Sequence, residues 1–351
     1  MTIDARAAPM MLDERTVAAR EPLRAGLVDS FGRTISYVRL SVTDRCDLRC
    51  TYCMAEQMQF LPKRDLLTLE EMAELADLMI ARGVRRIRLT GGEPLVRRGI
   101  LHLVEALGGR LGNGLDELTM TTNATQLAPV AARLHAAGMR RINVSLDSLD
   151  RDRFRTITRR GDLDQVLAGI AAAKAAGLHV KINMVALKGL NDGEFGAMLD
   201  WCARDGHDLT LIETMPLGEV ENDRTTNYLP LDRVKESLDE QFTLTPSLHR
   251  TGGPARYFEV AGARTKLGLI TPLTNNFCAG CNRIRVTATG TIFGCLGHDQ
   301  RVEIRDLLRA GGPASVNAAL DQLIAGKPLR HEFRIDAERP AVARHMSVTG
   351  G

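Results

Sequence analysis

Between residues 37 and 216, short strand-like stretches alternate with helical stretches, and this alternation constrains the fold more than any other feature of the chain. The six strand-like stretches are residues 37–43, 85–91, 116–122, 141–148, 179–187 and 208–215. Strands that alternate with helices favour a parallel α/β sheet with right-handed crossovers.

Two of the helical stretches carry clear start or stop signals. Thr68 and Glu71 form a capping-box pattern, which predicts a helix that begins just after Thr68. In residues 162–177, Gly177 predicts where a second helix ends.

Within the strand-like stretches, apolar and polar residues alternate. Val38 and Leu40 alternate with Arg39 and Ser41, and the later stretches follow the same pattern. Side chains two residues apart share a face, so one face of the sheet is apolar and the other is polar.

A filled eight-stranded barrel packs branched apolar residues inside, which this pattern does not supply. We therefore predict an open six-stranded (βα)6 partial TIM barrel whose lumen holds a polar ligand. A solvated sheet face is the alternative, but crossover helices normally cover the faces of such a sheet.

After Pro216 the alternation stops. Residues 217–351 contain scattered short strand-like runs and a short helical run at residues 302–312. We predict a smaller C-terminal α+β domain, residues 217–351, that covers the open side of the barrel formed by residues 29–216. Residues 1–28 are expected to be a flexible N-terminal extension.

Composition excludes few classes of protein. The chain has 351 residues, 25% of them charged, and a formal net charge of +3, so an anion site would have to be local. No apolar run approaches transmembrane length, and the opening residues lack the apolar region of a secretory signal. We expect a cytoplasmic protein without a membrane partner.

Six of the seven cysteines fall in two triplets, with the spacings C-x3-C-x2-C and C-x2-C-x13-C. They are Cys46, Cys50, Cys53, Cys278, Cys281 and Cys295. The seventh, Cys202, lies beside Trp201 in a helical pattern and is expected to be buried in the core. Clustered thiols in a chain without a secretory signal indicate metal ligands in a reducing cytosol rather than disulfides.

A triplet differs from a complete metal site because it leaves one position vacant. Structural zinc takes four ligands, and a cubane cluster has four irons, usually with four thiolates. A substrate or cofactor can bind at the vacant position. A zinc site completed by a distant histidine is the alternative, although C-x3-C-x2-C is not a common zinc-knuckle spacing.

The first triplet resembles that of the radical S-adenosylmethionine (SAM) enzymes, because Tyr52 precedes its last cysteine and "LTGGEPL" follows the second strand. In that superfamily the vacant iron binds SAM, whose cleavage yields a 5′-deoxyadenosyl radical. The two glycines of "LTGGEPL", Gly91 and Gly92, are expected to let the backbone approach the methionine part of SAM closely.

Longer motifs narrow the resemblance. "DSFGRTISYVRLSVTDRCDLRCTYCM", "INVSLDSLD", "FCAGCNRIRVTATGTIFGCL" and the terminal "GG" resemble the GTP 3′,8-cyclases of molybdenum cofactor biosynthesis, from about Asp29 to Gly351. In that family the second triplet holds a second cubane, whose vacant iron binds the purine of GTP. The resemblance therefore implies two [4Fe-4S] clusters, SAM as cofactor and GTP as substrate.

The resemblance also assigns residues by matching position. The two cysteine triplets would hold the clusters. The SAM site would include Tyr52, Gly92, Glu93, Ser145 and Met215. The GTP site would include Arg39, Arg88, Thr121, Lys181, Arg283, Ile284 and Arg285. Arg283, Gly350 and Gly351 would take part in catalysis.

The residue pattern supports the GTP set independently, since Arg39, Arg88, Thr121 and Lys181 lie on the polar strand faces. Guanidinium groups suit triphosphate oxygens. A surface salt bridge is the alternative for any one arginine alone, and a frayed terminus is the alternative for the glycine tail. The sequence departs from the family at Ala124, where glycine is usual, and at Ala55, where proline is usual. Ala124 argues against a required positive φ at that position, or implies a local shift.

The implied reaction begins when the 5′-deoxyadenosyl radical removes the ribose 3′ hydrogen of GTP. The carbon radical attacks purine C8 and gives 3′,8-cyclo-7,8-dihydro-GTP. The implied partners are an electron donor of the reduced flavodoxin or ferredoxin type and a downstream cyclic pyranopterin monophosphate synthase. The resemblance also allows a homodimer.

Two rival functions follow from other interpretations of the cysteines. One is a peptide-modifying radical SAM enzyme with an auxiliary cluster, although such enzymes usually carry more cysteines in the second domain. The other is a zinc-binding nucleic-acid module. Aromatic residues make up only 4% of the chain and the net charge is nearly neutral, so no nucleic-acid partner is expected.

Overall fold

A computed structural model of the chain describes residues 26–218, 220, 224–335 and 340–350. Its strands form a single twelve-stranded sheet in the order β12-β11-β10-β1-β2-β3-β4-β5-β6-β9-β8-β7. The strands are β1 Tyr37–Ser41, β2 Arg86–Thr90, β3 Glu117–Thr122, β4 Arg141–Ser145, β5 His179–Ala186, β6 Asp208–Glu213, β7 Leu244–Pro246, β8 Arg256–Val260, β9 Lys266–Ile270, β10 Arg283–Val286, β11 Thr291–Phe293 and β12 Arg301–Glu303.

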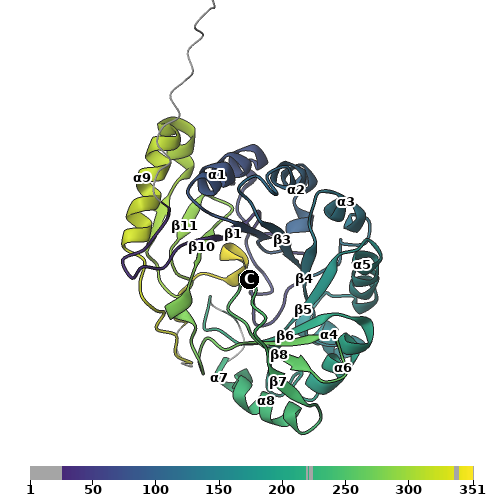
Figure 1. Cartoon of the computed structure of the whole chain (residues 1–351). Helices are drawn as coiled ribbons and strands as arrows, with labels where there is room; N and C mark the ends of the chain where they lie inside the picture. Colours follow the sequence, from purple (N-terminus) through teal and green to yellow (C-terminus); the bar gives the residue numbers. More distant parts are fainter. Residues whose placement is uncertain (1–25, 219, 221–223, 336–339, 351) are drawn as a thin grey trace, which may run out of the picture.

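Strands β1 to β6 pair in parallel, each with the next along the chain. The α-helices are α1 Leu69–Ala81, α2 Ile100–Gly108, α3 Ala131–Ala136, α4 Arg151–Thr158, α5 Leu163–Ala175, α6 Phe195–Asp205, α7 Arg224–Asn227, α8 Leu231–Asp239, α9 Gly312–Ala325 and α10 Met346–Thr349. Figure 1 looks into the curved sheet, with α1 to α6 outside it and α10, at the C-terminus, near its centre. The predicted open six-stranded α/β barrel is confirmed.

Local signals explain where the helices begin and end. Thr68 caps α1 in a reciprocal capping box with Glu71, as predicted. Asp162 caps α5 by accepting a hydrogen bond from the Asp164 backbone, and Gly177 follows its end with a φ of 87°. These caps fix the lengths of two helices that cover the outside of the barrel.

The alternation within the strands separates core from lumen. Val38 and Leu40 of β1 and Ile182 of β5 belong to the hydrophobic core beneath the helices, and Cys202 is also buried there, as predicted. The polar residues between them face the inside of the curved sheet. The apolar faces therefore stabilise the barrel, and the polar faces remain available to a ligand.

The C-terminal segment extends the barrel sheet at both edges. Strand β10 pairs in parallel with β1, and β9 pairs in parallel with β6. The sequence did not indicate this arrangement, because the short C-terminal strands show no periodicity that reveals their partners. It covers edges that would otherwise expose unpaired backbone groups.

Secondary structure near residue 302 differs from the prediction of a short helix at residues 302–312. Residues 301–303 form β12, which pairs with β11, and only Leu307–Gly311 form a helical turn, of π type. The 14-residue helix α9 that follows was not predicted; it begins with Gly312 and Pro313, residue types that usually mark turns. Pro313 is compatible with a first helical turn, where its missing N–H has no partner to lose.

Residues 1–25 of the predicted extension lie outside the described residues. Leu27 is buried, and its backbone N–H donates to Arg82 O at 3.2 Å. In the described part of the chain, no helix has the length and apolar character needed to span a bilayer.

Candidate functional site

A single cavity inside the curved sheet brings the predicted residues together. All six cysteines of the two triplets line it. It is also lined by Arg39, Tyr52, Arg88, Gly92, Thr121, Ser145, Lys181, Met215, Arg283 and Arg285. The sequence places these residues on different strands and loops, and the fold gathers them because parallel strands present their polar faces to one lumen.

The first triplet lies on the loop that follows β1. Cys53 N–H donates to Cys50 O at 2.9 Å, and Thr51 N–H donates to Ile157 O at 2.9 Å. Tyr52 donates its hydroxyl hydrogen to Asp147 Oδ2 at 2.7 Å. Burial raises the pKa of the Cys53 thiol to about 11. In this environment, thiolates at these positions need a cation such as iron beside them.

Asp47 fastens the same loop to the end of β3. It accepts hydrogen bonds from Asn123 Nδ2 and Thr125 Oγ1, both at 2.6 Å. Asn123 Nδ2 also lies 3.8 Å from Cys46 Sγ. Two strand ends thus hold the first triplet in place.

Glu93, predicted to bind SAM, has another role in the structure. Its buried carboxylate accepts hydrogen bonds from Leu95 N, Thr122 Oγ1 and Asn123 N at 2.9, 2.8 and 2.6 Å. Burial raises the pKa of Glu93 to about 7. Its side chain does not line the cavity, because it ties the end of β2 to the end of β3 instead.

The two glycines of "LTGGEPL" are needed for packing within the protein itself. A Cβ on Gly91 would lie 2.2 Å from Thr43 O, and a Cβ on Gly92 would lie 2.3 Å from Arg45 O. Gly92 N–H donates to Thr43 O at 2.9 Å. The glycines let β2 pack its end against the cysteine loop, whether or not SAM is bound.

Ala124 corrects a second expectation. An alanine here argued against a required positive φ or implied a local shift. Ala124 has a φ of 65°, so the first of these two expectations is wrong. The left-handed region costs an alanine about 1–2 kcal/mol. The strain lies directly after Asn123, and strained backbone often occurs at functional sites.

Cys278 and Cys281 of the second triplet lie in the loop between β9 and β10, and Cys295 lies just after β11. Cys281 N–H donates to Cys278 O at 3.0 Å, and Arg33 Nη1 donates to Cys278 O at 2.9 Å. Burial by itself would raise the pKa of the Cys281 thiol, but Arg283 and Lys327 lower it to about 7. The second triplet therefore has cations beside it, whereas the thiols of the first are surrounded mainly by neutral and acidic groups.

Three arginines lie side by side across neighbouring strands. Arg39 of β1 is in register with Arg285 of β10 and with Arg88 of β2. All three are buried, and burial together with Arg285 and Arg88 lowers the pKa of Arg39 far below its usual range. Like charges directly opposite one another destabilise a sheet.

These cations have no carboxylate partner within the part of the chain that the structure describes. Four polar atoms in side chains that line the cavity are buried without a hydrogen-bond partner among the described residues. They are Arg39 Nε, Arg88 Nε, Thr121 Oγ1 and Arg283 Nη1. Buried polar atoms normally have partners, so this arrangement fits an anionic ligand.

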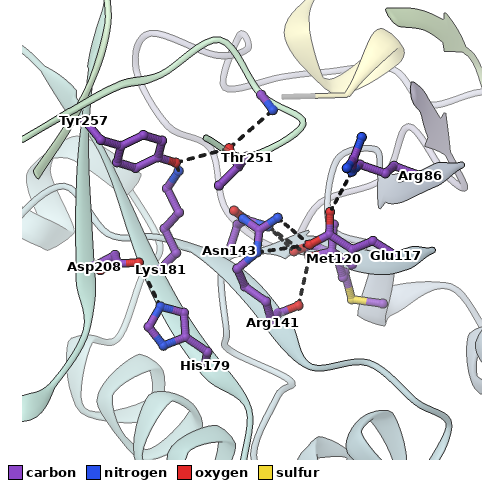
Figure 2. A network of polar contacts seen from close by, with 12 residues as sticks. Arg86, Glu117, Met120, Arg141, Asn143, His179, Lys181, Asp208, Thr251 and Tyr257 are labelled. Atoms are coloured by element: carbon purple, nitrogen blue, oxygen red, sulfur yellow. Dashed lines mark hydrogen bonds and ion pairs between the residues drawn. The ribbon is translucent and has the colours of Figure 1, made fainter. Parts of the chain in front are cut away.

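Lys181 of β5 completes the cationic group from the opposite side. Its Nζ donates to Tyr257 Oη at 2.5 Å, and Tyr257 Oη lies 3.2 Å from Thr251 Oγ1 (Figure 2). Burial, Arg88 and Arg141 lower the pKa of Lys181 to about 7. An anion that bound here would favour its protonated form.

The predicted residue Ile284 does not reach the cavity with its side chain. It lies between Arg283 and Arg285 on β10, so its side chain points to the opposite face and into the hydrophobic core. Only its backbone could contact a ligand.

The C-terminal tail enters the middle of the barrel (Figure 1). Arg285 Nη1 donates to the carbonyl oxygens of Thr349 and Gly350. Gly350 has a φ of 74°, and a Cβ on it would lie 1.9 Å from Thr90 Oγ1. Gly351 lies outside the described residues.

The residues present fit iron–sulfur clusters better than single metal ions. All described cysteines are free, and six of them line one cavity. No group of three or more His, Cys, Asp or Glu side chains among the described residues is arranged to hold one metal ion. In a cubane each cysteine binds its own iron, so the thiols need not converge on one point. The zinc alternative gains no support from this geometry.

Several site residues were not predicted from the sequence. Tyr257, Asp147 and Asn123 contact predicted residues, but they lie on separate strands or loops. Lys327 and His331 flank the second triplet from beyond α9. Asp147 and Asn123 had a sequence signal, since Asp147 lies in the quoted motif "INVSLDSLD" and Asn123 continues the polar alternation of its strand, directly before Ala124.

Comparisons with known proteins agree with this geometry. Residues 40–202 match the sequence profile of the radical SAM superfamily, and residues 207–333 match the profile described as Molybdenum Cofactor Synthesis C. The GTP 3′,8-cyclase of Erythrobacter litoralis is 61% identical over 93% of this chain and 98% of its own length. The GTP 3′,8-cyclase of Rhizobium etli is 56% identical over 96% of this chain and 98% of its own length.

A solved structure supports the fold. Streptococcus suis SuiB bound to S-adenosylmethionine superposes with a TM-score of 0.58 over 89% of this chain and 77% of SuiB, at 15% identity. At that identity the likeness concerns the fold alone.

Proposed function

Because the chain belongs to the GTP 3′,8-cyclase family of the radical SAM superfamily, we propose how the residues of its cavity divide the work of that reaction. The chain converts GTP into 3′,8-cyclo-7,8-dihydro-GTP in molybdenum cofactor biosynthesis.

Cys46, Cys50 and Cys53 would hold one [4Fe-4S] cluster, and Cys278, Cys281 and Cys295 would hold another. A cluster held there, together with SAM, would supply the radical chemistry that removes the ribose 3′ hydrogen of GTP. Tyr52, Gly92, Ser145 and Met215 line the cavity beside the first triplet, where SAM would bind. The Tyr52–Asp147 hydrogen bond would keep the cysteine loop fixed while the cofactor binds.

The buried cations would bind the triphosphate of GTP. Arg39, Arg88 and Arg285 form a row across three strands, and Lys181 faces them from β5. Several phosphate oxygens could accept charge-assisted hydrogen bonds from these groups. The purine would lie toward the second triplet, with Arg283 beside it.

The C-terminal tail would close the reaction space. Arg285 holds the backbone of Thr349 and Gly350 against Thr90, at the end of β2. A closed site excludes water and other hydrogen donors that would quench a carbon radical.

Partners follow from the same chemistry. A reduced flavodoxin or ferredoxin would supply the electron, and a cyclic pyranopterin monophosphate synthase would consume the product. A homodimer is compatible with this assignment. Oxygen-sensitive clusters and free thiols suit the reducing cytoplasm.

The match of both curated relatives over nearly the whole chain gives no support to a peptide-modifying enzyme or a zinc-binding nucleic-acid module.

The observation that carries the GTP assignment is the row of buried arginines without a carboxylate partner among the described residues. It can be tested by measuring GTP binding to the anaerobically reconstituted protein by calorimetry. Arg39→Met should weaken binding by at least about tenfold, because a charge-assisted contact is worth about 1.5–3 kcal/mol. Arg133→Met, which removes an exposed ion pair with Glu105, is the matched control and should leave binding unchanged. Equal affinities for wild type and Arg39→Met would contradict the assignment.

A further inference from the structure

Lys327 is a buried lysine that contacts the second cysteine triplet. Only 2% of its surface is exposed, and it follows the end of α9. Its Nζ donates to Gly294 O at 2.7 Å and to Cys281 Sγ at 3.4 Å. Gly294 precedes Cys295, so the ammonium group lies between two segments that carry cluster ligands.

To keep its positive charge in this environment, a lysine needs a negative charge nearby. Burial of an isolated ammonium ion is costly unless an anion accompanies it. Within the described residues, Lys327 has no carboxylate partner, and its two acceptors are a neutral carbonyl and the sulfur of Cys281. The sulfur is the one acceptor of the two that can carry negative charge.

We propose that Lys327 is a positioning residue of the second cluster, whose ammonium group donates to the Cys281 thiolate and offsets the negative charge of a cubane held by three thiolates. This inference rests on the proposed assignment of Cys278, Cys281 and Cys295 to that cluster. If Lys327 only held Gly294 O in place by a hydrogen bond, no positive charge would be required.

The charge has a direct consequence for electron transfer. Reduction adds a negative charge to a cluster, so a cation that contacts a ligand sulfur favours the reduced form. In the described part of the chain, no lysine or arginine side chain donates to the sulfurs of the first triplet, and the side-chain donor nearest to Cys46 is the Asn123 amide. Lys327 therefore raises the reduction potential of the second cluster.

The test is an anaerobic redox titration of the reconstituted protein, followed by electron paramagnetic resonance. The signal of the first cluster is identified by its response to added SAM and serves as an internal control. Lys327→Met keeps most of the side-chain volume and removes the charge. It should lower the equilibrium constant for reduction of the second cluster about tenfold or more, which for a one-electron couple is a fall of about 59 mV in reduction potential. The reduction potential of the first cluster should stay unchanged.

Two variants separate charge from packing. Lys327→Arg keeps the charge and should stay close to wild type, whereas Lys327→Gln keeps a donor without the charge and should behave like Lys327→Met. Lys235→Met is the matched control, because Lys235 forms an exposed ion pair with Asp239 outside the cavity. Loss of the second cluster's iron in Lys327→Met, with its retention in Lys327→Arg, would also support the proposal.

A measurement on the wild type covers the case in which the variants do not fold. Protein labelled with ¹⁵N-lysine should show a ¹⁵N hyperfine coupling at the reduced second cluster, by electron–nuclear double resonance. If the protein holds about eight irons per chain, either of two results would overturn the role of Lys327 alone. One is an unchanged potential of the second cluster in Lys327→Met, and the other is the absence of that coupling in the wild type. Only about four irons per wild-type chain would overturn the cluster assignment, and the role of Lys327 with it.

Discussion

Replacing Lys181 with methionine should stabilise the GTP-free protein and weaken its affinity for GTP at the same time. Lys181 is 4% exposed, and its Nζ donates a hydrogen bond to Tyr257 Oη (Figure 2). Burial and the nearby charges of Arg88 and Arg141 lower its pKa from 10.5 to about 7. The folded protein therefore binds a proton at this position less readily than the unfolded chain does.

The sign and size of the effect follow from this difference in pKa. Between pH 10.5 and pH 7 the unfolded chain holds the proton and the folded chain does not, so the stability of the wild type falls as the pH falls through this range. The full penalty, on the order of 5 kcal/mol, is present below pH 7. Lys181→Met removes it but loses a hydrogen bond worth about 1 kcal/mol. We expect a net gain of up to about 4 kcal/mol at pH 6.5, shrinking toward zero near pH 10.

Urea unfolding of the reconstituted, GTP-free protein at pH 6.5, 8 and 10 measures this gain. Lys63→Met is the control for loss of a lysine from the surface, because Lys63 is exposed, and it should change stability little at any of these pH values. The reasoning is wrong if Lys181→Met unfolds at the same or a lower urea concentration than wild type at pH 6.5. A stabilised variant that binds GTP poorly would show that Lys181 serves the ligand at the expense of the fold.

Three further predictions concern protons, packing and the tail. GTP binding at pH 8 should take up part of a proton because Lys181 becomes charged; calorimetry in buffers of different ionisation enthalpy measures the uptake, which should vanish in Lys181→Met. Gly92→Ala should lower the urea midpoint even in the cluster-free protein, because the new Cβ would lie 2.3 Å from Arg45 O; an unchanged midpoint would point to a role in SAM binding alone. Gly350→Ala should abolish cyclisation while iron content and SAM binding stay at wild-type levels, since its Cβ would meet Thr90 Oγ1; product formation at the wild-type rate would show that the tail position does not matter.

The sequence predicted the barrel because the alternation that indicates it can be recognised within each single strand. Alternation along each strand separates Val38 and Leu40 in the core from Arg39 in the lumen, and it does so without knowledge of neighbouring strands. The cysteine spacing was informative for the same reason, since three ligands fall within eight residues in the first triplet.

What the sequence missed depends on contacts between distant segments. Strands β9 and β10 are too short to reveal that they complete the edges of the barrel. Lys327 lies 46 residues from Cys281, and no pattern joins them. The side chain of Glu93 accepts hydrogen bonds from the next strand end, and this could not be predicted because a motif gives the residue type and not the direction of its side chain. Ala124 shows that a favoured glycine conformation can persist without glycine when its surroundings hold it.

The central claim is that one cavity holds SAM beside the first cysteine triplet and GTP along the arginine row, with the ribose between them. Incubation of anaerobically reconstituted protein with SAM, a reductant and GTP deuterated at the ribose 3′ position tests it most directly. Mass spectrometry should find the deuterium in 5′-deoxyadenosine, together with the cyclised product. Formation of 5′-deoxyadenosine without deuterium, at an undiminished rate of product formation, would contradict the account.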